Sequence, residues 1–147
     1  MARLPTPIVC VVIGEGGSGG ALGIGVGDRI AMLEHAYYSV ISPEGCGTIL
    51  WKASDQAPKA AAALRLTSRD LLRMGVIDEV IPEPLGGAHR SHLEAGAAVK
   101  SFLSRALRDL TDLPRTELLE RRYAKFRRIG DFVEGSPPQN GQPDAAG

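Results

Sequence analysis

The chain has 147 residues, of which 44% are hydrophobic, so it is long and apolar enough for one domain with its own core. Its 17 basic and 17 acidic residues cancel, which excludes an overall charge that favours nucleic acid or an anionic membrane. The only cysteines, Cys10 and Cys46, lie in no metal-binding or disulfide pattern, so we expect no metal site. The proline-interrupted start predicts neither a signal peptide nor a membrane span, and we expect a cytoplasmic protein.

The first predicted element is a strand over residues 8–13. This run is apolar at every position, rich in β-branched side chains and stopped by Gly14. Such a strand is typically buried on both faces, yet little precedes it that could cover them. A glycine-dense stretch follows as far as Gly27, and two more short strands are predicted over residues 29–33 and 37–41.

Two helices are predicted next. Ser42 precedes a proline and an acid, the typical start of a helix, and this helix carries residues 46–52. Asp55 can cap a second helix, rich in alanine, over residues 58–66.

A third helix begins with Thr67 or Ser68 as its cap and ends at Gly75, because glycine readily takes the left-handed conformation that ends a helix. A strand over residues 76–81 follows, closed by Pro82.

Two long helices end the ordered part, over residues 91–110 and 114–129. We expect residues 1–90 to form an α/β domain, 91–134 a helical arm and 135–147 a disordered tail, since that tail is rich in Gly, Pro, Gln and Ala. The arm carries leucines at helical spacing, namely Leu103, Leu107 and Leu110. This stripe fits either packing within the chain or a subunit interface.

The glycine-rich turn has a dinucleotide-binding interpretation. Residues 14–19 match G-x-G-x-x-G directly after a strand, and Glu34 lies where a ribose-binding acid is expected. The pattern needs a crossover helix of about three turns, whereas residues 20–27 offer about two. Each glycine there also lowers the stability of a helix by ~1 kcal/mol relative to alanine. Residues 37–41 also follow residues 29–33 too closely for a parallel crossover between them. We therefore reject this interpretation.

The same turn fits an oxyanion hole. Glycines after a strand let a ligand oxygen approach the backbone, and the N–H groups at a helix start point outward without partners. Such donors stabilise negative charge that develops in a transition state. The alternative is that the glycines only permit close packing of strand on helix.

Three separated blocks of this sequence resemble one family, the carboxyltransferase alpha subunit of multisubunit acetyl-coenzyme A carboxylase. They are V-I-G-E-G-G-S-G-G-A-L at residues 12–22, S-V-I-S-P-E-G-C at 39–46 and I-P-E-P-L-G-G-A-H-R at 81–90. The likeness extends over residues 7–126. It implies an α/β, crotonase-like fold, a ββα superhelix that is incomplete at the N-terminus here and carries C-terminal helices.

The resemblance also implies a reaction and a set of site residues. A carboxyl group moves from carboxybiotin, tethered to the biotin carboxyl carrier protein, to acetyl-CoA, giving malonyl-CoA for fatty-acid synthesis. The implied partners are a carboxyltransferase beta subunit in an α2β2 assembly and biotin carboxylase. The backbone of Gly19 and Gly20 corresponds to the oxyanion hole for carboxybiotin. The neighbouring residues expected to bind substrate are Gly16, Gly17, Ser18 and Ala21.

Several features stay open at this level. Glu15 fits a surface or structural acid better than a base, and neither His89 nor Arg90 receives a role. A basic run at residues 121–128 is expected to be solvated or to meet acidic neighbours. Two other functions remain, a crotonase-type hydratase or isomerase and a non-catalytic assembly fragment. Because members of the family are considerably longer, we expect this chain alone to be inactive or partly folded.

Overall fold

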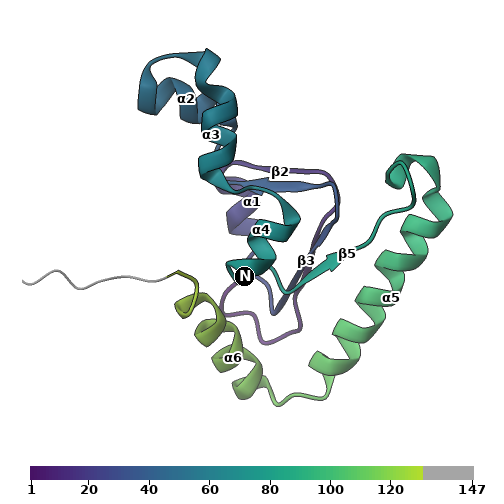
Figure 1. The fold of residues 1–147 in the computed structure, drawn as a ribbon. Helices are drawn as coiled ribbons and strands as arrows, with labels where there is room; N and C mark the ends of the chain where they lie inside the picture. Colours follow the sequence, from purple (N-terminus) through teal and green to yellow (C-terminus); the bar gives the residue numbers. More distant parts are fainter. Residues whose placement is uncertain (131–147) are drawn as a thin grey trace, which may run out of the picture.

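The structure, a computed structural model, describes residues 1–130 (Figure 1). The predicted tail from residue 135 therefore lies outside the described residues. Within them the chain forms two small parallel sheets that are surrounded by helices.

Successive strands alternate between the two sheets. β1 (Val9–Val12), β3 (Arg29–Leu33) and β5 (Glu79–Ile81) form one sheet in the order β1-β3-β5. β2 (Glu15–Gly17) and β4 (Tyr37–Ser39) form the other. Each pair of strands is followed by helix, so the chain winds as the expected ββα units. Parallel pairing of β1 with β3 needs no long crossover helix, because β2 and a short helix together return the chain.

The helices lie close to where the sequence predicts them. Their bounds are α1 Ser18–Ile24, α2 Pro43–Trp51, α3 Ala57–Leu64, α4 Ser68–Arg73, α5 His92–Thr111 and α6 Arg115–Arg127, with short 3-10 turns η1 Ser54–Gln56 and η2 Ala88–Arg90. Two predicted caps are confirmed: Ser42 Oγ accepts a hydrogen bond from Gly45 N at 3.1 Å, and Thr67 Oγ1 accepts one from Asp70 N at 3.3 Å.

Three local predictions are wrong. Asp55 caps no helix, because it lies inside η1 and Gln56 precedes α3 without a side-chain cap bond. The strand predicted over 76–81 begins only at Glu79, since the N–H groups of residues 76 and 77 donate to Leu71 O and complete the end of α4. The strand predicted over 37–41 ends at Ser39, whose hydroxyl donates to Ile41 O at 2.8 Å and turns the chain.

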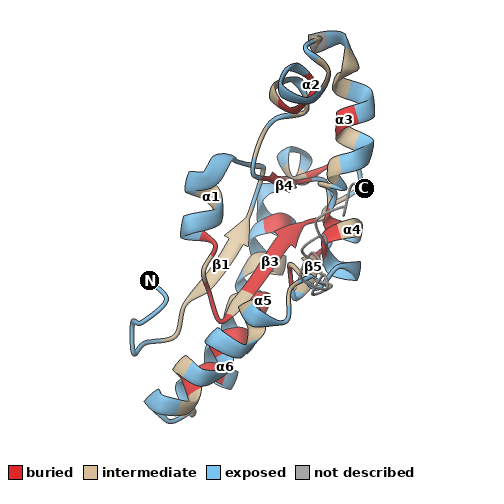
Figure 2. Ribbon diagram, turned by 90° about the vertical axis from the view of Figure 1, so that its left-hand side faces the viewer, coloured by how far each residue is buried: buried red, intermediate tan, exposed pale blue. Residues whose placement is uncertain are grey.

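The core lies on β3, which is the most buried strand (Figure 2). Residues 30–33 are at most 4% exposed, and Phe102 and Ala106 of α5 belong to the same hydrophobic cluster. The long helix therefore shares the core of the sheet. Its leucine stripe is mainly ordinary packing: Leu110 is buried and Leu103 packs against the core, whereas Leu107 is 45% exposed.

The first strand is confirmed, but it is not buried on both faces. β1 lies at the edge of its sheet, all four of its residues are only half-buried, and Ile13 just after it is 70% exposed. A cavity of about 560 Å³ opens beside it, lined by residues 8–16, α1 and Tyr38. Part of the apolar surface of β1 is therefore left uncovered by the described residues.

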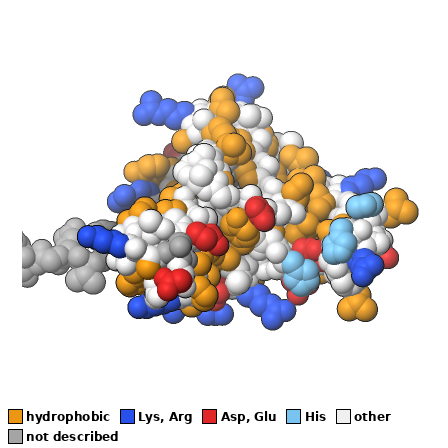
Figure 3. Space-filling model, turned by 90° about the horizontal axis from the view of Figure 1, so that it is seen from above, with side chains coloured by type: hydrophobic (Ala, Val, Ile, Leu, Met, Phe, Trp, Pro, Cys, Tyr) orange, Lys and Arg blue, Asp and Glu red, His pale blue; other side chains and the backbone are white. Residues whose placement is uncertain are grey.

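The α2–α3 pair projects from the body of the molecule (Figure 1). Ile49 and Leu50 of α2 are 70% and 63% exposed. Seen from above, the molecule carries hydrophobic side chains across its middle and lysine and arginine side chains near its edges (Figure 3). None of the helices within residues 1–130 has the length and apolar character needed to cross a membrane.

Candidate functional site

The glycine-rich turn lies where the chain passes from β2 into α1. Glu15 and Gly17 of β2 pair with Tyr37 and Ser39 of β4, which fixes the start of α1 at the end of the smaller sheet. Residues 17–20 are all exposed. Four of the six predicted site residues, Gly17, Ser18, Gly19 and Gly20, thus form one open turn.

Ser18 gives this turn its unusual backbone. Its φ of 76° is in the left-handed region, which a non-glycine residue adopts at a cost of about 1–3 kcal/mol. The hydroxyl Oγ of Ser18 accepts a hydrogen bond from Gly20 N at 3.3 Å, while Gly19 N has no acceptor among the described residues. One predicted donor is therefore free, and the other is held by a long bond that a stronger acceptor can replace.

The glycines of this region fall into two groups. One group fits close packing of strand on helix and the other fits an oxyanion hole, the two interpretations that the sequence left open. A Cβ added to Gly16 would come within 2.9 Å of Tyr38 and Val12, and one added to Gly27 would come within 2.8 Å of Cys10 Sγ. A Cβ on Gly25 would overlap the Tyr38 hydroxyl. These glycines permit close packing within the chain.

The second group faces open space. A Cβ at Gly14, Gly17, Gly19 or Gly23 would meet no atom within 4 Å. Packing inside the described chain does not require glycine at these positions. At Gly19, the missing side chain leaves room beside a free N–H, which is the arrangement an incoming oxygen needs.

The remaining predicted site residues, Gly16 and Ala21, face the other way. Both line the apolar cavity beside β1. The carbonyl oxygen of Ala21 accepts hydrogen bonds from Gly25 N at 2.9 Å and from Tyr38 Oη at 3.2 Å, so this residue anchors α1 to β4. The structure thus divides the six residues into an exposed turn and an inward-facing wall.

Two ionisable side chains near the turn, Tyr37 and Cys10, favour their neutral forms at neutral pH. The pKa of Tyr37 is raised above its ordinary value by desolvation and then by the nearby Glu15 carboxylate, to which Tyr37 Oη donates at 3.4 Å. Burial raises the pKa of the Cys10 thiol, which donates to Ile24 O at 3.4 Å. Neither side chain is therefore deprotonated to act as a nucleophile. The groups that the turn presents to a ligand are its backbone hydrogen-bond donors.

Glu34, the acid of the rejected dinucleotide pattern, is engaged elsewhere. Its carboxylate accepts from Arg69 at 3.1 Å. Strand β2 also lies between β1 and α1, so residues 14–19 do not form the strand, turn and helix that a dinucleotide site requires. The rejection holds, although β1 and β3 do pair in parallel.

His89 and Arg90 lie apart from the turn, in η2 after β5. Glu83 organises this segment, because its carboxylate accepts from Ala88 N at 2.7 Å and from His35 N at 2.9 Å. Both His89 and Arg90 are on the surface, and Leu85 in the same segment is fully exposed. The structure gives neither residue a part in the glycine-rich turn.

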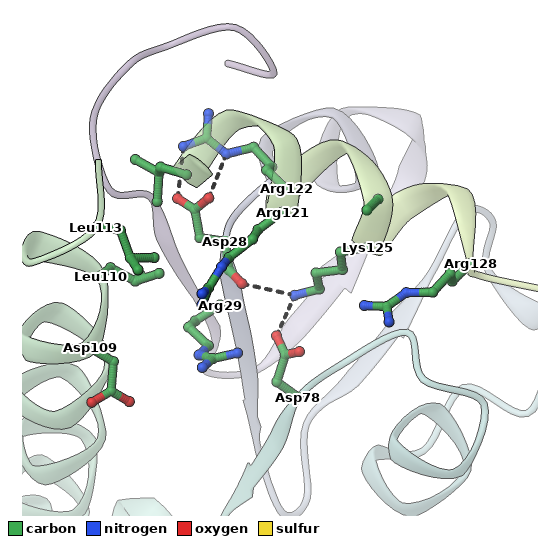
Figure 4. Close-up of a pocket in the computed structure, with 12 residues that line it drawn as sticks. Asp28, Arg29, Asp78, Asp109, Leu110, Leu113, Arg121, Arg122, Lys125 and Arg128 are labelled. Carbon is green, nitrogen blue, oxygen red and sulfur yellow. Dashed lines mark hydrogen bonds and ion pairs between the residues drawn. The ribbon is translucent and has the colours of Figure 1, made fainter. Parts of the chain in front are cut away.

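The sequence missed one buried polar cluster, which ties α6 to the sheet. Arg122 is 2% exposed, and its guanidinium binds both carboxylate oxygens of Asp28 at 2.8 and 2.7 Å. It also donates to the carbonyl oxygens of residues 1, 2, 4 and 6. Beside it, Lys125 pairs with Asp78. The basic run at residues 121–128 was expected to be solvated or to meet acidic neighbours. Both occur, since Arg122 and Lys125 pair with acids (Figure 4), whereas Arg127 and Arg128 are exposed.

Residues 1–130 contain no group of three His, Cys, Asp or Glu side chains close enough to hold a metal ion.

Comparison with solved structures supports the fold. The chain matches an enoyl CoA isomerase from M. smegmatis with a TM-score of 0.51 and 17% identity, covering 87% of this chain and 59% of that one. It matches an enoyl-CoA hydratase from Mycobacterium avium subsp. paratuberculosis with a TM-score of 0.50 and 21% identity, covering 87% and 54%. These enzymes have the crotonase fold, so the predicted fold class is confirmed.

Comparison with curated proteins is more specific. The acetyl-coenzyme A carboxylase carboxyl transferase subunit alpha of Rhodopirellula baltica is 64% identical over 136 residues, which is 92% of this chain and 43% of that protein. The subunit of the same name from Synechococcus elongatus is 54% identical over 92% of this chain and 42% of its own length. The chain thus spans less than half the length of these relatives. The family model described as acetyl co-enzyme A carboxylase carboxyltransferase-like matches residues 1–130, and the chain therefore belongs to this family.

Proposed function

We propose that this chain forms the carboxybiotin-facing part of a carboxyltransferase alpha subunit. In this role it helps to move a carboxyl group from carboxybiotin on the carrier protein to acetyl-CoA, which gives malonyl-CoA. The observation that carries the proposal is the exposed turn at residues 17–20, where Gly19 N has no acceptor and a Cβ would meet nothing in the described chain. The family and the names of the relatives support the same reaction.

The proposed chemistry is electrostatic. Carboxybiotin, when bound, supplies the carboxyl group that is transferred. The N–H groups of Gly19 and Gly20 donate hydrogen bonds to its ureido oxygen, where negative charge develops as the carboxyl group leaves. Gly20 N exchanges its 3.3 Å bond to the Ser18 hydroxyl for this stronger acceptor. Two preorganised donors of this kind need no titratable side chain, which agrees with the protonated states of Cys10 and Tyr37.

The other half of the reaction belongs to partners. The turn is open to solvent, and water weakens each hydrogen bond to a developing charge. We propose that a carboxyltransferase beta subunit closes the site in an α2β2 assembly and holds the acetyl thioester. The biotin carboxyl carrier protein brings carboxybiotin, biotin carboxylase supplies it, and the assembly works in the cytoplasm on the path to fatty acids.

A pair of valine substitutions tests the role of the turn. Gly19→Val and Gly23→Val place the same side chain on the same helix, and a Cβ at either position would meet nothing within 4 Å outside the helix's own backbone. Introduced into a full-length alpha subunit of the family with its beta subunit, Gly19→Val should lower malonyl-CoA formation by about 10² to 10³. The Gly23→Val enzyme should stay near the normal rate. Both should assemble normally in gel filtration, so equal losses in the two variants would remove the oxyanion assignment.

Two further measurements separate the proposal from the other functions. Incubation with an enoyl-CoA substrate tests a hydratase or isomerase, and turnover by the 147-residue chain would favour that activity. Capture of the beta subunit together with unchanged malonyl-CoA formation in the Gly19→Val enzyme would favour a purely assembling role. We expect no malonyl-CoA from the purified chain alone, because the exposed turn at residues 17–20 supplies donors but no thioester site.

A further inference from the structure

The helices α2 and α3, with the turn η1 between them, form a hairpin over residues 43–64 that projects from the body of the molecule (Figure 1). These three elements pack mainly on one another. None of the described residues of the hairpin belongs to the hydrophobic cluster that forms the core. The hairpin therefore gains little stability from the two sheets.

The interior of the hairpin is built from small residues. Among its described residues, only Cys46, Gly47 and Ala60 are buried. A Cβ added to Gly47 would come within 3.1 Å of Ala53 O, so glycine lets α2 lie close to the chain that leads into α3. Small residues bury little apolar surface, and the hydrophobic effect is proportional to the surface that is buried. The packing of α2 on α3 is therefore a weak source of stability.

The large aliphatic side chains of α2 are exposed instead. Ile49 and Leu50 are 70% and 63% exposed, and Val40, shortly before α2, is 53% exposed. The two helices have nine and eight residues, fewer than the ~12–15 that an isolated helix needs for marginal stability in water. Short helices depend on packing, and here the side chains that could supply it face outward. Such a surface is typical of a contact with another protein.

The hairpin begins beside the glycine-rich turn. Ser39 pairs with Gly17 of the turn, and α2 begins four residues after Ser39. Desolvation, then the Glu15 carboxylate and last the Glu44 carboxylate raise the pKa of Tyr37, so the first turn of α2 lies near the strand that leads into the glycine-rich turn. A protein that closes over this turn therefore also meets the hairpin.

We infer that the α2–α3 hairpin is a docking surface for the beta subunit, which contacts it through Ile49 and Leu50. This inference rests on the function proposed above, in which the beta subunit brings the acetyl thioester to the exposed turn. A subunit that delivers an acceptor there sits against the surface beside the turn, and the hairpin supplies uncovered aliphatic side chains to that surface. The matching surface of the beta subunit is apolar, and the contact stabilises the hairpin as well as the assembly.

The substitutions Ile49→Glu and Leu50→Glu, made in a full-length alpha subunit of the family, test this inference. Each places a charge in the apolar contact and should weaken binding of the beta subunit by about tenfold or more. Malonyl-CoA formation should return to near the normal rate in a large excess of beta subunit, because the turn itself is intact. Tyr123→Glu is the matched control. Tyr123 is also 70% exposed, but it lies on α6, which binds Asp28 just before β3, so its affinity should be unchanged.

Three results would overturn the inference. In the first, the hairpin variants weaken beta-subunit binding no more than Tyr123→Glu does. In the second, they lower the melting temperature of the alpha subunit alone, which would mean that its own chain covers the hairpin. In the third, the alpha subunit alone forms dimers that these variants dissociate, which would make a second copy the occupant.

The Gly19→Val enzyme separates this inference from the proposed function. It should bind the beta subunit normally and stay slow even in a large excess of that subunit. A normal rate in Gly19→Val, together with weakened binding in Leu50→Glu, would reject the oxyanion role of the turn while supporting the docking surface. Slow turnover in Gly19→Val with unchanged binding in Leu50→Glu would do the reverse.

Discussion

Replacement of Arg122 by methionine should destabilise the chain more than any other single change in α6. The Arg122 and Asp28 side chains are 1% and 3% exposed, and two hydrogen bonds of 2.8 and 2.7 Å join them. Methionine keeps much of the apolar length of arginine but leaves the Asp28 carboxylate buried, with Ile8 N as its remaining donor. Removing one partner of such a pair costs about 3–5 kcal/mol.

The four carbonyl oxygens of residues 1–6 that Arg122 holds add a second consequence. They are only partly buried, so water can replace the lost donor, and we expect loosening of this segment rather than a further large cost. Because whole domains are stable by only about 5–15 kcal/mol, the Arg122→Met chain should retain little stability.

Urea unfolding followed by circular dichroism measures this effect, and amide hydrogen exchange at Ile8 reports on the N-terminal segment. Arg121→Met is the matched control on the adjacent residue, since its pair with Glu117 is exposed and contributes about 0–1 kcal/mol. The double variant Asp28→Leu with Arg122→Met should recover part of the loss, because it leaves no buried charge. If Arg122→Met costs no more than Arg121→Met, the reasoning from burial is refuted.

Three further predictions follow from the same structure. Gly25→Ala should lower the free energy of unfolding by about 1–3 kcal/mol, because its methyl group overlaps the Tyr38 hydroxyl. Gly23→Ala should raise it by up to ~1 kcal/mol, because alanine favours helix α1. Melting temperatures that shift in the same direction for both variants would contradict this. Thr67→Ala should cost ~1 kcal/mol of unfolding free energy through loss of the cap on α4, and an unchanged urea midpoint would count against it. Folding raises the pKa of the Cys10 thiol above its ordinary value of 9.0, so the rate of its alkylation should increase with pH only above 9.0. The stability that the protonated thiol contributes is present below pH 9.0 and is lost as the pH rises through the pKa of the folded chain. A midpoint of the alkylation rate below pH 9.0 would disprove the shift.

The sequence predicts those features that depend on neighbouring residues. Ser42 and Thr67 cap helices because the cap bond spans only three residues, and the apolar run before Gly14 forms a strand because β-branched side chains favour it. The Gly-rich turn is also recognised, since its pattern of residues resembles one family. Asp55 fails as a cap because it lies within η1, and Gln56 is the residue that directly precedes α3.

Tertiary structure decides what depends on distant partners. Gly19 and Gly25 are the same residue type in one short segment, yet the position of Tyr38 makes Gly25 a packing glycine while Gly19 faces open space. Arg122 belongs to a run that looks uniformly basic, and only the packing of α6 brings it to Asp28, 94 residues earlier in the chain. The sequence by itself indicates most of the elements and the glycine-rich character of the turn, because these follow from local propensity and pattern. Which glycines are free and which charges are buried follows from contacts between segments, and these exist only once the chain has folded.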